Sequence, residues 1–353
     1  MKASEFKTTR AVVIERPYEA NLREIKLTEP KEDAFVAKTL YSSISTGTDM
    51  KTYKGMQHPE QCYYPLVPGY ETAGVVVAVP ENPEAITRIP ESARNLKVGD
   101  RVAMAWTTHQ ELININHTDI YNRANVYPIS DKVSYENAAL FHIGTFPLAA
   151  IRKCGLEIGE SAIVMGMGIL GLFAIPLLKA AGAAPVIAVD PVPEKREKAI
   201  AAGADFAFDP FAPNFAKQVK EVTGGGANVG IEVTGVGAGL DGILDCMAPF
   251  GRVALLGCTR NKNFTIDYYG KVHSPGITLV GAHTMARPKF ESSKGWWTQG
   301  DDIRALIRLT EMERIDLASL IDEVHSPLEA PDVYTRLANE SAFPIVQFDW
   351  RLL

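Results

Sequence analysis

A glycine-rich turn between an apolar segment and an apolar helical pattern constrains the fold most. The run from Ala162 to Met165 predicts a buried strand, and Gly166, Gly168 and Gly171 follow it in the spacing G-x-G-x-x-G. In this pattern the first glycine makes a tight turn, the second lets the backbone approach a pyrophosphate, and the third lets the helix pack on the strand. The helix then directs its free N–H groups at the phosphates. We therefore predict a dinucleotide site formed by Gly166, Met167, Gly168, Ile169, Leu170 and Gly171.

An acidic residue at the end of the next apolar segment supports this prediction. Asp190 ends the run P-V-I-A-V-D about 20 residues after the glycine turn, where a carboxylate accepts the adenosine ribose hydroxyls. Because it would repel a ribose 2′-phosphate, we expect NAD rather than NADP. The alternative is that Asp190 only caps the next helix. Lys195 and Arg196 follow on that predicted helix, where they could reach the ribose or its phosphate, or form a solvated face.

Composition limits the class of protein. A chain of 353 residues exceeds the size of one growing core, so two domains are expected. A hydrophobic fraction of 46% with 22% charged residues is typical of a globular enzyme, and a net charge of −6 gives no general attraction to nucleic acid. We found no signal segment or membrane-spanning run. We expect a cytoplasmic protein with a small-molecule substrate, no nucleic-acid or membrane partner, and four reduced, scattered cysteines.

The chain begins with a β-rich part. Strand-like runs near 11–14, 34–40, 74–79 and 98–103 are separated by turn residues. The proline-rich stretch 80–90 predicts a surface excursion. From Ser134 the apolar spacing becomes helical and leads into the glycine turn.

The middle of the chain alternates between strands and helices. The strand candidates are 162–165, 186–189, 206–208, 229–233, 252–256 and 277–280. Such alternation predicts a doubly wound parallel sheet. The remainder contains predicted helices near 303–309 and 331–337 and a strand near 345–348. It is too short for a third core, so we assign 1–153 and 282–353 to one domain and 154–281 to an inserted nucleotide domain.

Three further motifs carry a resemblance to a known family. The run from Thr46 to Asp49 is similar to C-G-T-D, the run from Pro65 to Gly74 to P-x-x-x-G-H-E-x-x-G, and Val98 to Val102 to V-G-D-R-V. With the glycine turn and Asp190, they resemble the medium-chain dehydrogenase/reductase superfamily, of zinc-type alcohol dehydrogenases, over essentially the whole chain. The resemblance implies an α/β fold: a GroES-like β-rich catalytic domain with an inserted Rossmann doubly wound parallel sheet.

The positions that bind catalytic zinc in this superfamily are altered. They hold Thr46, Tyr70 and, on the helix before the nucleotide domain, His142. A hydroxyl and a phenol are poor zinc ligands compared with thiolate and imidazole. Residues 80–130 contain no cysteine, so the structural-zinc lobe is missing too. We therefore predict no metal site.

A rebuilt metal site is the open alternative. It would use Glu71 and His142 with His58 or Cys62, because catalytic zinc needs three convergent ligands.

Two short motifs indicate a branch of the superfamily. The runs 44–48 and 65–71 are most similar to the zinc-less branch of bacteriochlorophyllide a dehydrogenase, which is understood to oxidise a secondary alcohol with NAD. We predict a zinc-independent, NAD-dependent dehydrogenase of a secondary alcohol, with polyols, sugars and cyclic alcohols as candidates. The alternatives are an NAD(P)H-dependent enoyl or quinone reductase and an NAD-binding protein without catalysis. The resemblance also implies a homodimer or homotetramer through the nucleotide domain.

Without zinc, another group must handle the substrate proton. Tyr70 could act as acid/base if a nearby cation, Lys51, lowers its pKa, and Thr48 matches the hydroxyl that passes the proton outward in zinc relatives. Their structural alternatives are a packed tyrosine, a solvated lysine and a turn threonine. Glu71 could be catalytic or form a buried ion pair. His142 could be the base or an ordinary helix-face histidine.

Other candidates surround the cofactor. By resemblance, Thr145 lies beside the nicotinamide. Thr234 and Cys258 follow later strands and are expected to line the cofactor cleft at the carboxyl ends of the sheet. Trp296 and Trp297 could form the wall of a substrate pocket or part of a subunit interface.

Overall fold

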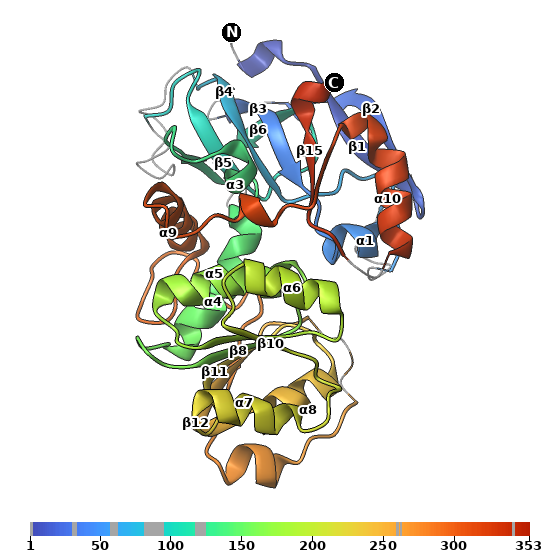
Figure 1. Cartoon of the computed structure of the whole chain (residues 1–353). Coiled ribbons are helices and arrows are strands. Elements are labelled where there is room, and N and C mark those ends of the chain that lie inside the picture. Colours follow the sequence, from blue (N-terminus) through green and yellow to red (C-terminus); the bar gives the residue numbers. More distant parts are fainter. Residues whose placement is uncertain are drawn as a thin grey trace. The chain divides into compact units, whose positions relative to one another are not determined.

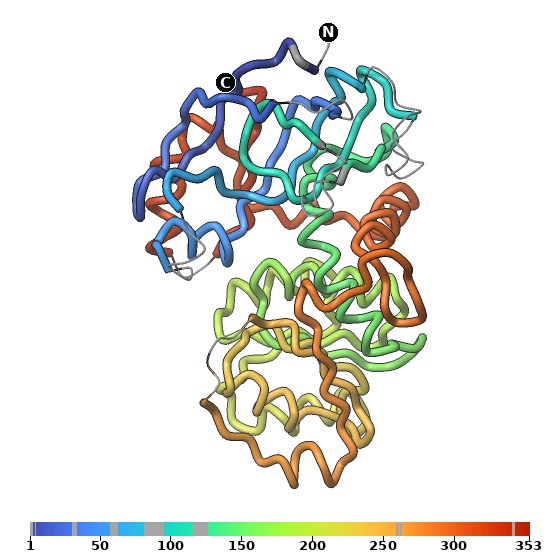
Figure 2. The backbone as a smooth tube through the Cα atoms, turned by 180° about the vertical axis from the view of Figure 1, so that it is seen from behind, coloured from blue at the N-terminus to red at the C-terminus, as the bar shows by residue number. Residues whose placement is uncertain are grey.

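The computed structural model describes residues 3–29, 34–56, 63–80, 95–116, 125–258, 261, 263–340 and 343–353. It contains two compact units. The β-rich unit comprises residues 1–142 and 307–353, and the parallel-sheet unit comprises residues 143–306. Both ends of the chain, blue and red in Figures 1 and 2, belong to the β-rich unit.

The parallel-sheet unit is built on a six-stranded sheet in the order β10-β9-β8-β11-β12-β13, with every pairing parallel. Its strands are β8 (Ala162–Met165), β9 (Val186–Val189), β10 (Phe206–Phe208), β11 (Ala227–Glu232), β12 (Met247–Leu255) and β13 (Thr278–Gly281). The strand order reverses between β8 and β11, as in doubly wound dinucleotide-binding sheets. The predicted fold class is confirmed, and the predicted bounds of β8, β9 and β10 coincide with the observed ones.

Helices cover both faces of this sheet. They are α4 (Phe141–Cys154), α5 (Ile169–Ala181), α6 (Pro193–Ala201), α7 (Phe215–Thr223), α8 (Gly237–Asp245) and the π-helical turn η3 (Tyr269–His273). Figure 1 shows α5 and α6 on one face and α7 and α8 on the other. Because both faces are covered, β8 and β9 consist of fully buried apolar runs rather than alternating ones.

The β-rich unit contains a larger, mainly antiparallel sheet in the order β14-β15-β3-β4-β5-β7, with β6 also paired to β3. Its strands are β3 (Ala34–Ser43), β4 (Glu71–Ala78), β5 (Arg101–Ala105), β6 (Leu112–Asn116), β7 (Asn125–Pro128), β14 (Glu323–His325) and β15 (Val346–Asp349). A separate hairpin pairs β1 (Thr8–Arg16) with β2 (Glu19–Lys26). The C-terminal strand β15 pairs antiparallel with β3, which joins the end of the chain to its beginning.

Short helices complete the β-rich unit. They are α1 (Thr48–Tyr53), α3 (Tyr135–Ala138), α10 (Ala330–Asn339) and the 3-10 turns η1 (Ala3–Glu5), η4 (Ala318–Leu320), η5 (Pro327–Glu329) and η6 (Trp350–Leu352). The α10 helix packs its apolar face, with Val333, Tyr334 and Leu337, into a core that includes Tyr53 and Phe348. This amphipathic packing explains the apolar periodicity near 331–337.

The bounds of the compact units differ from the domain bounds expected from sequence. Helix α4 from Ile143 onward and residues 282–306 cluster with the parallel sheet. Helix α9 (Gln299–Glu311) spans the second bound. The functional division at 153/154 and 281/282 stays a prediction, and most of the proline-rich stretch 80–90 lies outside the described residues. Among the described residues, no helix combines the length and apolarity needed to cross a membrane.

Candidate functional site

The glycine turn after β8 leaves open space at the place where the protein backbone is expected to approach a pyrophosphate. Gly166 has a φ of +102°, a conformation that favours glycine. A Cβ on Gly171 would lie 1.8 Å from the Gly166 carbonyl oxygen, so the start of α5 packs directly on the turn. A Cβ on Gly168, in contrast, would meet nothing within 4 Å. The first N–H groups of α5 have no acceptor within the helix, so they can bind an anion at the open side.

Asp190 connects the end of β9 to this turn. Its carboxylate is buried, with Oδ2 accepting the Met167 N–H at 2.8 Å and Oδ1 accepting the Val192 N–H at 2.9 Å. The carboxylate therefore does more than stabilise the start of the next helix. Each oxygen keeps a further lone pair for a ligand hydroxyl. The Arg196 guanidinium donates to the carbonyl of Asp190 at 2.7 Å, and the Lys195 side chain is half-buried on α6.

A second carboxylate organises the end of β11, and sequence reasoning missed it. Glu232 is buried and accepts hydrogen bonds from the Thr234 N–H at 2.8 Å, the Gly235 N–H at 3.2 Å and the Thr234 hydroxyl. Burial raises the pKa of the Glu232 carboxyl. A Cβ on Gly166 would meet Thr234 Cγ2 at 2.9 Å, so this loop lies against the glycine turn. The sequence signal that could have identified Glu232 is an acidic residue at the end of an apolar strand.

The exposed Cys258 follows β12, and the backbone of Gly235 packs against it. A Cβ on Gly235 would come within 3.1 Å of the Cys258 carbonyl carbon. Thr234 and Cys258 therefore belong to adjoining loops, as expected of residues after neighbouring parallel strands.

An ionic cluster anchors the last part of the parallel-sheet unit. Asp302, in the first turn of α9, is completely buried, with Oδ1 2.9 Å from the Arg152 Nε and Oδ2 3.5 Å from the Arg287 Nη1. Arg287 also donates to the Thr145 carbonyl at 3.3 Å. Burial raises the pKa of Asp302 to about 6 despite the two guanidinium groups. Thr145 itself is buried on α4.

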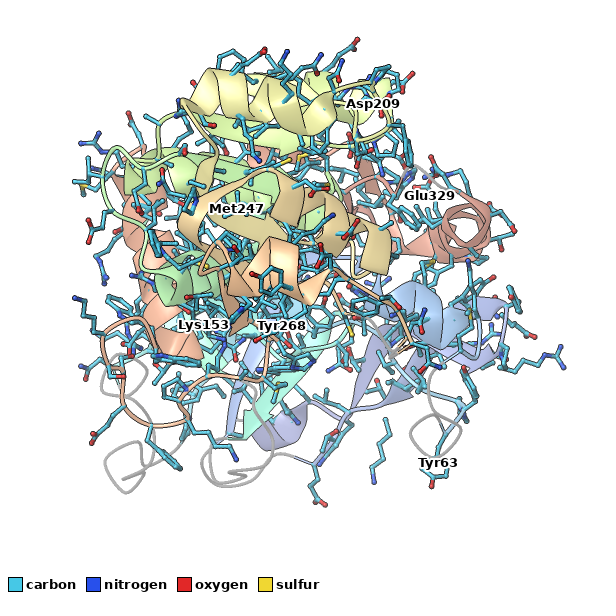
Figure 3. All side chains as sticks on the ribbon, turned by 90° about the horizontal axis from the view of Figure 1, so that it is seen from below. Tyr63, Lys153, Asp209, Met247, Tyr268 and Glu329 are labelled. Atoms are coloured by element: carbon cyan, nitrogen blue, oxygen red, sulfur yellow. The ribbon has the colours of Figure 1, made fainter. Side chains whose placement is uncertain are left out.

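The tryptophan pair covers cations at the end of α4. The Arg152 guanidinium lies 3.6 Å from the Trp297 ring centre, and the Lys153 ammonium, labelled in Figure 3, lies 4.9 Å from the Trp296 ring centre. These cation–π contacts give both rings a packing role within one unit.

In the β-rich unit, Tyr70 lies in a cluster of three rings. Its ring centre is 5.0 Å from that of His142 and 6.3 Å from that of Trp106, and the Trp106 and His142 centres are 4.6 Å apart. Trp106 follows β5 with a φ of +60°, which is rare for a bulky residue. The Tyr70 hydroxyl donates to the Ser45 Oγ at 2.7 Å. Two of the altered zinc positions are therefore brought together as packed rings.

The charges around Tyr70 are opposite to those expected. Burial, followed by the carboxylates of Glu71 and Asp49, raises the pKa of the Tyr70 phenol, although hydrogen bonds with Ser45 and Thr48 oppose the shift. The Lys51 side chain is exposed on α1. The expectation that a cation lowers the pKa of Tyr70 is therefore wrong. Under ordinary conditions this phenol keeps its proton.

A buried network supports the loop that carries Tyr70. Asp49 accepts hydrogen bonds from the Ser45 N–H at 2.9 Å and the Gly69 N–H at 3.2 Å, and its Oδ2 lies 3.2 Å from the His109 Nε2. Thr46 and Glu71 are buried in the same unit, whereas Thr48 is exposed at the start of α1.

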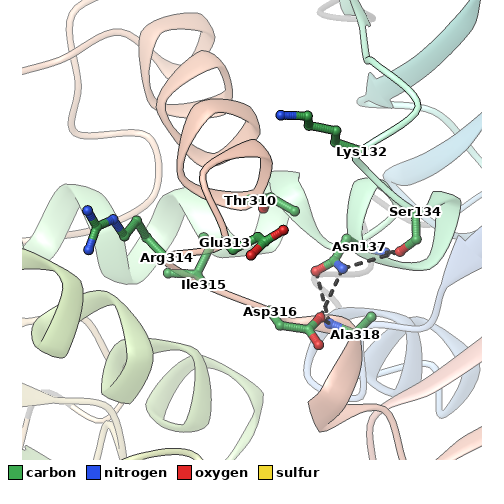
Figure 4. Close-up of a pocket in the computed structure, with 9 residues that line it drawn as sticks. All are labelled: Lys132, Ser134, Asn137, Thr310, Glu313, Arg314, Ile315, Asp316 and Ala318. Carbon is green, nitrogen blue, oxygen red and sulfur yellow. Dashed lines mark hydrogen bonds between the residues drawn. The ribbon is translucent and has the colours of Figure 1, made fainter.

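A pocket of about 530 Å³ lies in the β-rich unit, lined by residues in or just before α3 and by residues between 310 and 318, which include the end of α9 (Figure 4). Asn137, one of its lining residues, donates to Asp316 at 2.9 Å and to the Ser134 Oγ at 3.2 Å. Its Oδ1 accepts hydrogen bonds from the N–H groups of Leu317 and Ala318, so this side chain connects α3 to residues 316–318. No predicted site residue lines this pocket.

Two family sequence models match the chain. The family described as "Alcohol dehydrogenase GroES-like domain" matches residues 32–136, and the family described as "Zinc-binding dehydrogenase" matches residues 170–295. The chain belongs to the medium-chain dehydrogenase/reductase superfamily.

Curated members of the superfamily align with different shares of this chain. The (R,R)-butanediol dehydrogenase of Bacillus subtilis strain 168 is 33% identical over 192 residues, which are 49% of this chain and 53% of that enzyme. The chain thus matches about half the length of the butanediol enzyme. The L-threonine 3-dehydrogenase of Pyrococcus horikoshii is 28% identical over 292 residues, 75% of this chain and 79% of that enzyme.

Solved structures show the same fold. A short chain alcohol dehydrogenase from Escherichia coli CFT073, complexed with NADH, superposes with a TM-score of 0.78 at 18% identity, covering 98% of this chain and 100% of that one. At this level of identity the likeness concerns the fold.

The donor atoms at the altered zinc positions do not fit a catalytic zinc ion. Thr46 offers a hydroxyl and Tyr70 a phenol with a raised pKa, which leaves the His142 imidazole as the ordinary zinc ligand. The residues that the structure describes contain no cluster of three or more His, Cys, Asp or Glu side chains suited to a metal. His58 and Cys62, candidates for a rebuilt site, lie outside the described residues.

Proposed function

We propose that this protein is a zinc-independent, NAD-dependent dehydrogenase that transfers a hydride between a secondary alcohol and the nicotinamide. The observation that carries the proposal is the Tyr70 hydroxyl, held 2.7 Å from Ser45 Oγ beside the His142 and Trp106 rings. By the family resemblance, Tyr70 and His142 stand at positions that bind the catalytic zinc ion in zinc-dependent members. A protonated phenol at this position can donate a hydrogen bond that stabilises the developing charge on the substrate oxygen.

The glycine turn and Asp190 support NAD as the cofactor. Asp190 would accept the ribose hydroxyls, while the open side of Gly168 and the N-terminus of α5 would receive the pyrophosphate. Thr145, Thr234 and Cys258 are proposed to line the rest of the site. When bound, NAD supplies the carbon that accepts the hydride.

Tyr70 is proposed to move the substrate proton. In carbonyl reduction its phenol donates a hydrogen bond and then the proton to the substrate oxygen, and in alcohol oxidation the phenolate takes that proton back. The raised pKa of Tyr70 favours the proton-donating form. His142, whose ring centre lies 5.0 Å from that of Tyr70, is the alternative base.

The names of the relatives support a secondary alcohol as substrate. One relative is named as a dehydrogenase of (R,R)-butanediol, and the other as a dehydrogenase of L-threonine at position 3. In both molecules the hydroxyl is on a secondary carbon. Polyols, sugars and cyclic alcohols are the classes to test first.

Binding titrations and a substrate screen test this proposal. NAD is expected to bind at least about tenfold more tightly than NADP, because the Asp190 carboxylate repels a 2′-phosphate. An Asp190→Ser variant should reduce this preference. With NAD, secondary alcohols should be oxidised and conjugated enones left unchanged. Enone reduction with NADPH alone would replace the proposal by the reductase alternative, and NAD binding without any turnover would favour a non-catalytic role.

Metal analysis of the purified protein tests the zinc-independent part. We expect zinc well below one ion per chain and unchanged turnover after chelation. Stoichiometric zinc that is lost together with activity would overturn this part, and a Cys62→Ser variant would then show whether that residue is a ligand.

A further inference from the structure

A histidine that no motif predicts lies completely buried behind Tyr70. His109 stands in the turn between β5 and β6, with its Nδ1 2.9 Å from the Ser42 Oγ and its Nε2 3.2 Å from Asp49 Oδ2. Ser42 Oγ also accepts the Trp350 Nε1–H at 2.9 Å. All four side chains are buried.

The chemistry of the two ends sets the direction of this chain of hydrogen bonds. The Trp350 indole can only donate, and the ionised Asp49 carboxylate can only accept. The Asp49 contact therefore requires a proton on His109 Nε2. A neutral imidazole then leaves Nδ1 as an acceptor, and Ser42 supplies the donor while it accepts from Trp350. The neutral ring is thus confined to one tautomer.

His109 also contacts the backbone that positions Tyr70. Its N–H donates to the Pro68 carbonyl at 2.8 Å. Gly69 has a φ of +99°, and a Cβ on it would lie 2.9 Å from the His109 Cδ2. The imidazole therefore packs against the residue that precedes Tyr70.

Asp49 connects the His109 ring to both partners of the hydrogen bond between the Tyr70 hydroxyl and the Ser45 Oγ. One carboxylate oxygen accepts the N–H of Gly69, the neighbour of Tyr70, and the other accepts the N–H of Ser45, whose hydroxyl accepts from Tyr70. Rotation of the carboxylate would move the donor and the acceptor of that contact relative to each other.

We propose that His109 is a positioning residue: its Nε2–H orients the Asp49 carboxylate, which in turn fixes the Tyr70 hydroxyl against Ser45. The inference rests on the proposed function for its catalytic consequence, but its geometric content concerns the β-rich unit alone. A hydroxyl that handles a proton must be held within a few tenths of an ångström, so loss of this support lowers the rate of the chemical step more than it weakens binding.

A pair of variants separates positioning from packing. His109→Phe keeps a ring but removes both nitrogens, whereas the His109→Gln amide supplies a donor for Asp49 and an acceptor for Ser42. We expect kcat to fall about 10- to 100-fold in His109→Phe, with the KM of the alcohol within about threefold of wild type, and to recover to within about threefold in His109→Gln. The Kd of NAD should stay within about twofold in both, because the predicted cofactor residues are on other elements.

The matched control is His325→Phe. His325 also pairs with carboxylates in the β-rich unit, with its Nε2 2.8 Å from Glu323 and its Nδ1 3.3 Å from Glu329, so its loss is expected to leave kcat unchanged. Thermal unfolding of each variant reports whether the fold is kept.

Two NMR signals test the inference without using activity. The ¹⁵N shifts of His109 should have the pattern of the Nε2–H tautomer. The ¹³Cζ signal of Tyr70, assigned with Tyr70→Phe, should move in His109→Phe and return in His109→Gln. The inference is overturned if His109→Phe leaves both the Tyr70 signal and kcat unchanged, or if the glutamine variant is as impaired as the phenylalanine one. Absence of alcohol turnover in the wild type, with the expected NMR results, would instead contradict the proposed function.

Discussion

The Tyr70 hydroxyl is held beside two carboxylates, and this determines how it can act. Burial and the charges of Glu71 and Asp49 raise the pKa of the phenol above its ordinary value of about 10. Below that pKa the phenol is protonated. Carbonyl reduction should therefore show no loss from Tyr70 ionisation between pH 7 and 10, whereas alcohol oxidation should keep rising, because the phenolate becomes more populated.

The pH profiles of kcat in both directions check this prediction. An oxidation rate that levels off near pH 7 would show that a group other than the Tyr70 phenol takes the proton.

Removal of the hydroxyl is the direct test at this scale. Tyr70→Phe keeps the ring contacts with Trp106 and His142 but removes the proton donor. We expect turnover to fall about 10²- to 10⁴-fold, as for other general acids. A loss of less than about threefold in steady-state turnover would show that Tyr70 is a packed side chain.

At the residue scale, motif positions could be predicted but their partners could not. Tyr70 and His142 stand at positions that the family resemblance identifies. Ser45 and Tyr70 are 25 positions apart, and Asp49 and His109 are 60 apart. Such contacts depend on the tertiary pairing of strands, for which no local pattern exists. For Lys51 the sequence left a catalytic cation and a solvated lysine as alternatives, and the exposed position agrees with the second.

At the element scale, two glycines of the turn are expected to have different roles: Gly168 in NAD binding and Gly171 in stability. A Cβ at Gly168 enters open space with a φ of −78°, so Gly168→Ala should unfold at the wild-type temperature, yet weaken NAD binding about tenfold or more by occupying the approach to the pyrophosphate. Gly171→Ala would place its Cβ 1.8 Å from the Gly166 carbonyl oxygen and should cost about 1–3 kcal/mol of stability or more.

Thermal unfolding and NAD titration of the two variants check this contrast. Equal loss of stability in both would contradict the assigned roles of the two glycines.

Helix α9 depends on the buried Asp302. Its pKa is raised to about 6, above the value of about 3.9 expected in the unfolded chain. A carboxyl whose pKa is higher in the folded than in the unfolded chain contributes fully to stability below its unfolded-state pKa. This contribution is lost as the pH rises through its folded-state pKa. Between pH 4 and 7 the wild type should therefore lose up to about 3 kcal/mol relative to Asp302→Asn, which does not titrate.

Urea unfolding of both proteins across this range measures the difference. A constant difference in the free energy of unfolding would show that Asp302 stays ionised in the folded state.

The strands of the parallel sheet could be predicted well because their pattern is local. Continuous apolar runs bounded by glycine or acidic residues defined β8, β9 and β10 at their observed bounds. Strands β2, β6, β7 and β14 were not predicted, although Ile113 and Ile115 of β6 alternate with asparagines. The position of these strands is set by the strands with which they pair.

At the scale of the whole molecule, β13 forms one edge of the parallel sheet. Its strand neighbour among the described residues is β12, and Leu279 on it is 37% exposed. An unpaired edge with an apolar side chain is a site for association with a second chain. We expect a homo-oligomer that Leu279→Lys shifts toward the monomer, whereas Ile158→Lys, at a position 90% exposed in the same unit, has no such effect.

Light scattering at several protein concentrations gives the oligomeric state. A wild type that is monomeric throughout would rule out this edge as an interface under those conditions.

The uneven exposure of the cysteines provides a chemical reporter. Burial raises the pKa of Cys154 and of Cys246 to about 12, whereas Cys258 is exposed next to the loop of Thr234 and Gly235. Thiol reagents attack the accessible thiolate, so in a Cys62→Ser background a maleimide dye should label Cys258 preferentially. Slower labelling in the presence of NAD would then map the cofactor to this loop without any knowledge of the substrate.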